Sequence, residues 1–497
     1  MKIVLLFTLA LFMILAFGFT PVQAKEWTVM VYMAADNGPN EDLEGDAWVD
    51  LYEMLQAKVD TDKVNIVVEG DFGSKGNDGR YLLQGDTPKM IKKYDEINLG
   101  DPKNLEKFIK ETKNDYPADR YMMVFWGHGT GMISVAGPGT IAAKKNSRSR
   151  TAHDYIYEST VGLNKIFAKK AVEALIGYRR PSRSFAYDES SKDSITLVEA
   201  KQALDNAGVK FSVISFDACI MNQAEVLYQL RDYTDYITAA FTYFPGGGYW
   251  YTGWLKALSD NSSMSNEDLA KAILASNKKY YTDEKLYIED FTLTVKYRII
   301  KSLNNNKEEV LKEMEKQGIP ADKFDEFCQQ YAKQYVKENL SDIQAAAKKA
   351  FKAQPLNFGM LNISKMDDFR IALDNMINIT NKDIALEARQ HATAYNPLFG
   401  EKYGDWYIDT HSFAKYIEEN GNCQQKLAAK AVINAIEAVE VKRIDINLDG
   451  TDLANAYFGI LFPENVKLYN VISKFYTPLE FAKDSSWDEF LAELAKK

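Results

Sequence analysis

The sequence predicts an α/β protein in which a mostly parallel central sheet is flanked by helices, with a largely helical C-terminal addition. Two mainly apolar runs, 121–126 and 213–216, have the pattern of strands buried on both faces of a sheet. Before residue 260, strand patterns alternate with helical ones, as crossover connections between parallel strands require. After residue 300, the stretches 301–352 and 367–440 are mostly helical in pattern.

Local signals set the bounds of the elements in the first part of the chain. In order, the sequence predicts a strand over 27–35, a helix over 46–57, a strand over 64–69, a hairpin with arms 80–84 and 89–94, a helix over 101–113, the strand 121–126, a helix over 196–207, the strand 213–216 and a strand over 236–241. Asp101 is expected to cap its helix, with Pro102 at the first helical position. Gly208 is expected to end the helix that precedes the strand 213–216.

These patterns divide the chain into three parts. The parts are a leader over 1–24, a sheet domain over 25–260 that carries a basic insertion over 132–185, and a mostly helical region over 261–497. Within the last part, the sequence predicts a helix over 266–281 capped by Ser265, an extended stretch over 284–300, the two long helical stretches, and short strands over 441–481.

The leader has the features of a secretory signal peptide. Lys2 precedes an uncharged apolar run over 3–19, and Val22 and Ala24 are the small residues expected before a cleavage site near Ala24. The mature chain is therefore expected to be exported, either secreted or periplasmic. The apolar run is short for a membrane span and no later stretch is long enough, so we expect no membrane span in the mature chain.

Charge and cysteine content narrow the classes of function. The formal net charge of −10 argues against a nucleic-acid-binding protein. The chain has three cysteines, Cys219, Cys328 and Cys423, too few for the disulfide scaffold of an exported protein. If Cys328 and Cys423 pair, Cys219 is the remaining free thiol, but the sequence leaves that pairing open.

Cys219 and His128 each follow a predicted buried strand, where α/β sheets bind their ligands. Gly127 and Gly129 allow the backbone beside His128 to approach a ligand closely. The imidazole and the positive end of a helix predicted over 222–230 would both favour the Cys219 thiolate. Such a pair supplies a nucleophile and a proton-transfer partner. Either residue alone fits a core role equally well, but the two together favour catalysis.

Two segments carry a family resemblance. Trp126-Gly127-His128-Gly129 and Ser215-Phe216-Asp217-Ala218-Cys219 resemble the catalytic segments of the clostripain family of cysteine peptidases, which has the caspase-like α/β sandwich of gingipains, legumain and separase. Further matching segments are 31–37, 186–190, 245–249 and 458–463. The resemblance implies an endopeptidase that cleaves protein or peptide substrates after Arg or Lys. It implies no required cofactor, although calcium occurs in this family.

The resemblance also assigns roles to single residues. Cys219 would attack the scissile carbonyl, and His128 would protonate the leaving amine. The backbone N–H groups of Gly129 and Cys219 would form the oxyanion hole, in which one donor contributes about 3 kcal/mol. Asp217 resembles the acidic residue at the base of the S1 pocket, which pairs with a basic side chain; the alternative role for Asp217 is a helix N-cap. The chain departs from its relatives at 239–241, where Ala-Ala-Phe replaces a segment that tends to carry Ser-Glu or Ser-Gln.

The basic insertion is long for a connection between two strands of one sheet. Exposed loops are where proteolytic nicking concentrates, and relatives are activated by cleavage in the corresponding segment. The resemblance therefore implies a zymogen that cleaves itself after a basic residue. The candidate cleavage sites are Lys144, Lys145, Arg148, Arg150, Arg179, Arg180 and Arg183.

Two other interpretations of the sequence stay open. Residues 445–450 match the first half of a calcium loop, but its twelfth position is Ala456 and not Glu, which favours a solvated turn over an EF-hand. A different class of function is a catalytically inactive relative that binds peptides or a protein partner. The presence of both His128 and Cys219 argues against this second alternative.

Overall fold

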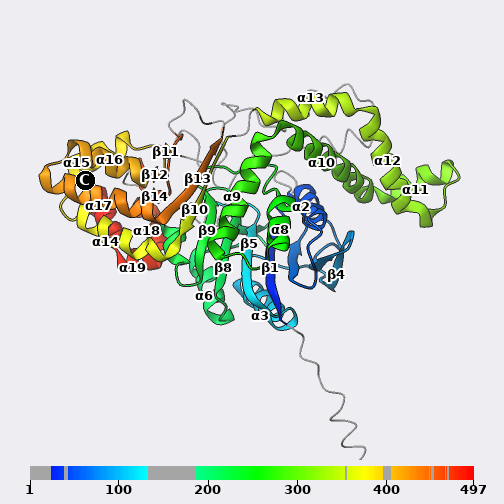
Figure 1. The fold of residues 1–497 in the computed structure, drawn as a ribbon, viewed down its shortest axis with the longest axis horizontal. Helices are drawn as coiled ribbons and strands as arrows, with labels where there is room; N and C mark the ends of the chain where they lie inside the picture. Colours follow the sequence, from blue (N-terminus) through cyan, green and yellow to red (C-terminus); the bar gives the residue numbers. More distant parts are fainter. Residues whose placement is uncertain are drawn as a thin grey trace, which may run out of the picture.

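The computed structural model describes residues 24–37, 43–132, 185–352, 355–395, 405–446, 448, 453–464, 466 and 469–496. Its centre is a nine-stranded sheet (Figure 1). The strands are β1 (Lys25–Ala34), β2 (Val64–Asp71), β3 (Gly79–Gln84), β4 (Thr87–Lys93), β5 (Ala118–Trp126), β8 (Phe211–Asp217), β9 (Thr234–Ala240), β10 (Leu356–Asn362) and β13 (Glu440–Ile446). Their order across the sheet is β13-β10-β9-β8-β5-β1-β2-β3-β4. The block from β9 to β2 is parallel, and antiparallel strands extend it at both edges, which confirms the predicted fold class.

Alternate residues of the central strands pack into two hydrophobic clusters, one on each face of the sheet. On β1, Tyr32 belongs to one cluster and Val31 to the other. The Tyr32 face is covered by α3 (Pro102–Asp115), α6 (Leu197–Ala207), α7 (Ala224–Gln229), α14 (Met366–Ile377) and α17 (Cys423–Val439). The opposite face is covered by α2 (Glu44–Gln56), α8 (Tyr251–Asp260), α9 (Asn266–Thr282) and the first part of α10 (Glu284–Asn305).

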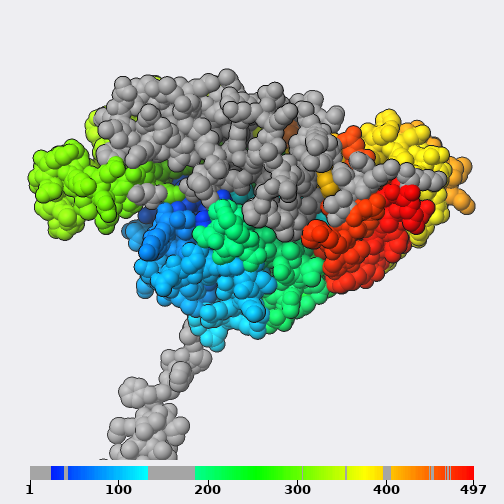
Figure 2. All heavy atoms as spheres, turned by 180° about the vertical axis from the view of Figure 1, so that it is seen from behind, coloured from blue at the N-terminus to red at the C-terminus, as the bar shows by residue number. Residues whose placement is uncertain are grey.

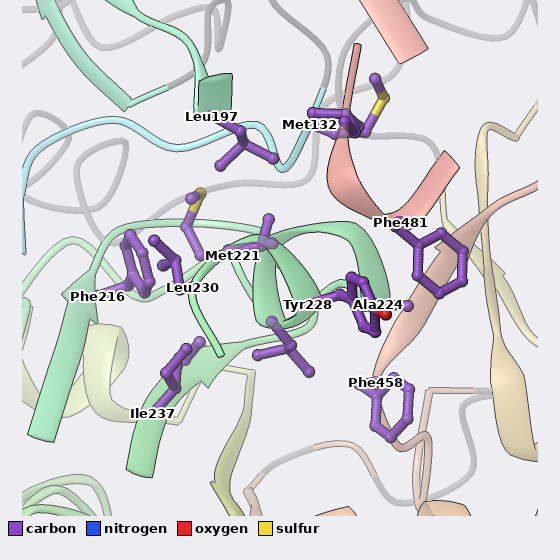
Figure 3. Packing of buried hydrophobic residues seen from close by; sticks show 14 of the residues in the cluster. Met132, Leu197, Phe216, Met221, Ala224, Tyr228, Leu230, Ile237, Phe458 and Phe481 are labelled. Atoms are coloured by element: carbon purple, nitrogen blue, oxygen red, sulfur yellow. The ribbon is translucent and has the colours of Figure 1, made fainter. Parts of the chain in front are cut away.

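Two groups of helices extend to either side of the sheet, as Figures 1 and 2 show from opposite directions. One is an arm formed by the end of α10 with α11 (Lys307–Lys316), α12 (Phe324–Glu338) and α13 (Leu340–Phe351), whose small core includes Leu303, Met314 and Cys328. The other contains α15 (Lys382–His391), α16 (Thr410–Asn420), α18 (Tyr469–Tyr476), α19 (Glu480–Asp484) and α20 (Trp487–Ala495). Figure 3 shows this second group meeting α7, where Tyr228 packs against Phe481 with ring centroids 5.4 Å apart.

The remaining elements are short. They are strands β6 (Phe185–Asp188), β7 (Asp193–Ile195), β11 (Ala394–Tyr395), β12 (Tyr407–Asp409) and β14 (Gly459–Leu461), and 3₁₀ turns at Ala321–Lys323 and Ile363–Lys365. Among the residues that the structure describes, no helix combines the length and the apolar character needed to cross a membrane.

The local capping signals are confirmed. The Asp101 side chain accepts a hydrogen bond from the backbone N–H of Lys103, at the start of α3. Thr196 and Glu199 form a capping box at the start of α6, and Gly208 ends that helix with a left-handed φ of 60°. The Ser265 side chain caps α9 as predicted.

The predicted organisation after residue 260 needs three corrections. The sequence predicts short strands over 441–481, but among the described residues only β13 and β14 are strands there, and α18 and the start of α19 are helical. The stretch 284–300 is not extended but lies in α10, capped by Asp283, because its β-branched and aromatic residues pack on both the sheet and the arm. In addition, β10 and β13 belong to the central sheet, so the sheet does not end by residue 260. Pairing of a distant antiparallel strand with an edge leaves no local signal in the sequence.

The three cysteines are all free thiols, so the possible pairing of Cys328 with Cys423 is not formed. Cys328 is buried in the core of the arm, whereas Cys423 is exposed at the start of α17. Residues 1–23 of the predicted leader 1–24 and residues 133–184 of the basic insertion 132–185 lie outside the described residues.

Candidate active site

The ends of β5 and β8 bring the two predicted catalytic segments together. These strands are parallel neighbours in which Trp126 pairs with Asp217, and the Gly127 N–H donates a hydrogen bond to the Asp217 carbonyl at 3.2 Å. Gly127 has a φ of 137°, which only glycine adopts readily, so the chain can turn away from the strand at this point. The next residue, His128, is buried with 7% of its surface exposed.

The turn that follows His128 lies directly against the turn that contains Cys219. A Cβ atom on Gly129 would lie 2.3 Å from the Cys219 carbonyl oxygen and 3.0 Å from Ala218 Cβ, so only glycine fits here. Within the described part of the chain, the backbone N–H groups of Gly129 and Cys219 donate no hydrogen bond. Two neighbouring amides without an acceptor are the arrangement that an oxyanion would need.

The turn after Cys219 is fixed by β9. Ile220 adopts a φ of 60°, an uncommon conformation for a β-branched residue. Its N–H donates a hydrogen bond to the Thr242 carbonyl, and the N–H of Asn222 donates one to the Ala240 carbonyl, both at 2.9 Å. Helix α7 starts only at Ala224 and is shorter than the predicted helix 222–230. Its N-terminus is therefore separated from Cys219 by this turn.

The environment of the thiol differs from the prediction of a lowered pKa. Cys219 as a residue is partly exposed, and its Sγ atom accepts a hydrogen bond from the Phe244 N–H at 3.3 Å. Desolvation raises the pKa of Cys219 to about 11; the Phe244 N–H opposes this shift, and the negative charge of Asp217 adds to it. In this conformation the Cys219 side chain is therefore a neutral thiol at neutral pH.

This protonation state predicts slow alkylation of Cys219 in the intact chain. Iodoacetamide should modify Cys219 more slowly than exposed Cys423 at pH 7.5, and its rate should rise as the pH approaches about 11, because the thiolate is the nucleophile. Mass spectrometry of the two cysteine peptides gives both rates from one sample. Faster labelling of Cys219 than of Cys423 at pH 7.5 would contradict the prediction.

Asp217 ends β8 and is buried, with 6% of its surface exposed. Its Oδ2 atom accepts hydrogen bonds from the Tyr249 N–H at 3.1 Å and from the Tyr251 hydroxyl at 2.9 Å. Desolvation raises its pKa to about 7, although both hydrogen bonds oppose this shift. The cap position of α7 is occupied by Gln223, so Asp217 does not cap that helix.

Two further buried acids, which sequence reasoning missed, lie beside Asp217. Asp50 and Glu53 are on α2 and are both buried. Asp50 accepts a hydrogen bond from Trp126 Nε1 at 2.6 Å, and its pKa is raised well above the usual value by desolvation and by the charge of Asp217. Glu53 accepts a hydrogen bond from the Tyr251 N–H at 2.9 Å. The available signal was two acids three positions apart on the apolar face of a helix.

Two tyrosines from distant segments lie near the thiol. The rings of Tyr243 and Tyr395 meet edge to face with centroids 5.5 Å apart. Burial raises the pKa of both hydroxyls, and a charge on Cys219 adds to both shifts. Ala239, Ala240 and Phe241, where the chain departs from its relatives, are fully buried. No polar side chain from these three positions therefore reaches the site.

One group of side chains in the described residues has the spacing to share a metal ion. It consists of Asp36, Asp71 and Glu96 and lies at the ends of β1, β2 and β4, separate from Cys219. The seven candidate cleavage sites, from Lys144 to Arg183, all fall outside the described residues.

Comparison with known proteins agrees with this geometry. A family model described as the clostripain family matches residues 31–143 and 173–493. The chain is 24% identical over 275 residues to clostripain from Hathewaya histolytica, a match that covers 48% of this chain and 44% of that protein. The chain thus aligns with less than half of the length of this relative.

Solved structures show the same fold. A secreted C11 cysteine protease from Bacteroides thetaiotaomicron, in complex with an irreversible peptide inhibitor, has a TM-score of 0.56 at 18% identity, over 93% of this chain and 99% of that one. An inactive zymogen C11 protease from Parabacteroides distasonis has a TM-score of 0.55 at 15% identity, over 93% of this chain and 98% of that one. At these identities the likeness concerns the fold alone.

Proposed function

This chain belongs to the clostripain family, and from that premise we propose that it is an exported cysteine endopeptidase that cleaves after Arg or Lys. The observation that carries the proposal is the contact between the turns of His128 and Cys219, in which the backbone amides of Gly129 and Cys219 have no acceptor among the described residues. A structural role for these segments would not need a close approach with unused donors.

In the proposed reaction, Cys219 Sγ attacks the scissile carbonyl carbon and forms a carbon–sulfur bond. The carbonyl oxygen becomes an oxyanion, which the N–H groups of Gly129 and Cys219 stabilise. The tetrahedral intermediate then collapses, the carbon–nitrogen bond breaks, and His128 delivers a proton to the leaving amine. Water hydrolyses the thioester, which releases the carboxylate product and restores the thiol.

Asp217 supports the proposed preference for substrates with Arg or Lys before the cleaved bond. It is a buried acid two residues before the proposed nucleophile, and its Oδ1 atom has no hydrogen-bond partner among the residues that the structure describes. A Lys or Arg side chain of the substrate would supply the missing donor and the missing positive charge.

Covalent labelling tests the proposal. A peptide acyloxymethyl ketone with Lys at P1 should modify Cys219 under reducing conditions, because the warhead reacts with a nucleophilic thiolate next to a bound P1 residue. A reagent with Glu at P1 serves as the matched control and should label much less. If activated protein is not labelled at Cys219, the chain is better described as an inactive relative that binds peptides or a protein partner.

We further propose that the intact chain is a zymogen. Support comes from the neutral Cys219 thiol and from the seven basic residues in the insertion that joins the His128 and Cys219 segments. Cleavage after one of them should convert the intact chain into two fragments that remain associated, because β5 and β8 belong to one sheet. Mapping of new N-termini by mass spectrometry should show cuts between 144 and 183 in the wild type. The Cys219→Ala protein should stay intact, and equal cutting in both would mean that another protease acts.

A further inference from the structure

Five carboxyl side chains gather at one place on the sheet, across β1 from the candidate active site. Asp36 follows β1, and Asp71 ends β2, the neighbour of β1 on the side away from β5. Glu96 follows β4, Asp78 precedes β3, and Asp188 ends β6. Ligand atoms of Asp36, Asp71 and Glu96 all lie within 4.8 Å of one another. Two oxygens bound at about 2.4 Å on opposite sides of one ion would have this same separation.

Asp71 provides an independent indication of a ligand. Its side chain is fully buried, and neither carboxyl oxygen has a hydrogen-bond partner among the residues that the structure describes. Asp188 is also fully buried, and its Oδ2 atom likewise has no partner within those residues. A buried carboxylate without a partner is costly, and native structures satisfy nearly all such groups. In the described part of the chain, no Lys, Arg or His forms an ion pair with any of the five acids.

The other oxygens of the group are held in place by backbone donors. Asp36 Oδ2 accepts a hydrogen bond from the Ser190 N–H at 3.0 Å, and its carbonyl accepts one from Glu189 at 2.8 Å. Asp188 Oδ1 accepts a hydrogen bond from the Ser191 N–H at 2.9 Å. The group is therefore a built arrangement that links the ends of β1 and β2 to the segment 188–191.

We propose that Asp36, Asp71 and Glu96 bind one divalent cation with the ligand preferences of calcium, with Asp188 beside them as a further carboxylate. All of these donors are oxygens, which suits hard cations and does not suit the nitrogen and sulfur sites of zinc. The ligands come from irregular segments at the ends of strands, and calcium accepts such flexible geometry where magnesium demands a near-ideal octahedron. The cation would join the strand ends to the segment that follows the basic insertion.

The site differs from the half-match to a calcium loop at 445–450. Asp445 Oδ1 accepts a hydrogen bond from Asn357 Nδ2 at 2.7 Å, and its Oδ2 pairs with Arg443 at 2.8 Å. Both of its oxygens are therefore already engaged. The acids around Asp71 instead have no positively charged partner in the part of the chain that the structure describes, so the stronger candidate lies there.

Calorimetric titration of metal-stripped protein with CaCl₂ tests the proposal. The full chain with Cys219→Ala is used as the parent, so that self-cleavage cannot change the sample. One site per chain is expected, with a Kd of about 10⁻⁴ M or tighter, and MgCl₂ should bind at least about tenfold more weakly. Calcium should also raise the melting temperature of the protein by about 1–2 °C at 5 mM.

Two variants locate the site. Asp71→Asn should weaken calcium binding at least about tenfold, and Glu96→Gln, on an exposed side chain that cannot prevent folding, should weaken it as well. Asp260→Asn is the matched control, because this exposed acid pairs only with Lys256 on α8, and it should bind calcium like the parent. Absence of binding by the parent would overturn the proposal. So would a response that survives Asp71→Asn and Glu96→Gln but is lost in Asp445→Asn.

Discussion

Replacing Cys219 with alanine is expected to reduce peptide hydrolysis to the uncatalysed rate while the protein keeps its fold. Alanine occupies less space at a partly exposed position and removes the only atom that can form the thioester. His128→Ala should lower kcat by about 10²–10⁴-fold, since general acid–base catalysis contributes that much. Hydrolysis of a fluorogenic peptide with Lys at P1 measures both losses.

The design must separate loss of chemistry from loss of activation. Each variant is first cleaved with a trace of tagged wild-type protein, which is then removed, so that all samples carry the same cut. Cys423→Ala is the matched control, because this exposed cysteine lies at the start of α17 and should leave activity unchanged. Turnover close to that of the wild type in cleaved Cys219→Ala would show that the reaction does not pass through this thiol.

The parallel core and the pairing of the two strand ends could be predicted because they leave local marks. The apolar runs that became β5 and β8 end in Gly127 and Asp217, residues that seldom continue a buried strand. The capping residues Asp101 and Ser265 likewise act within one helical turn. Signals of this kind concern neighbours in sequence, so the sequence alone is sufficient to find them.

The parts that could not be predicted depend on contacts between distant segments. Strand β10 pairs with β9 across more than a hundred residues, and no residue in either strand encodes that choice. The pKa of Cys219 is raised rather than lowered because the surrounding segments desolvate the sulfur, an effect that the hydrogen bond from the Phe244 N–H only partly offsets. The acids Asp36, Asp71 and Glu96 are far apart in sequence and meet only because β1, β2 and β4 end near one another.

The buried carboxyl of Asp217 affects both the stability of the fold and the proposed preference for a basic P1 side chain. Its pKa of about 7 lies above the 3.8 of an exposed Asp, so the folded state holds its proton more tightly than the unfolded state does. Below about pH 4 the protonated Asp217 therefore does not lower the free energy of unfolding. Its destabilising effect grows as the pH rises from about 4 to about 7 and is complete above that value. A substrate cation that pairs with the carboxylate would offset this cost, and Asp217→Asn would remove it.

Asp217→Asn is expected to lower kcat/KM for substrates with Lys or Arg at P1 by about 10²–10³-fold, equivalent to about 3–4 kcal/mol for a broken buried pair. The variant should leave kcat/KM nearly unchanged for a substrate with norleucine at P1, which has a side chain like that of lysine but without the charge. Its melting temperature at pH 8 should be no lower than that of the wild type, because asparagine can still accept the Tyr251 hydrogen bond and carries no charge.

The wild-type preference for lysine over norleucine should grow as the pH rises through about 7, where Asp217 loses its proton, and the variant should lack this dependence. An unchanged preference for lysine in Asp217→Asn would assign the S1 charge to another acid, of which Asp50 and Glu53 are the nearest candidates.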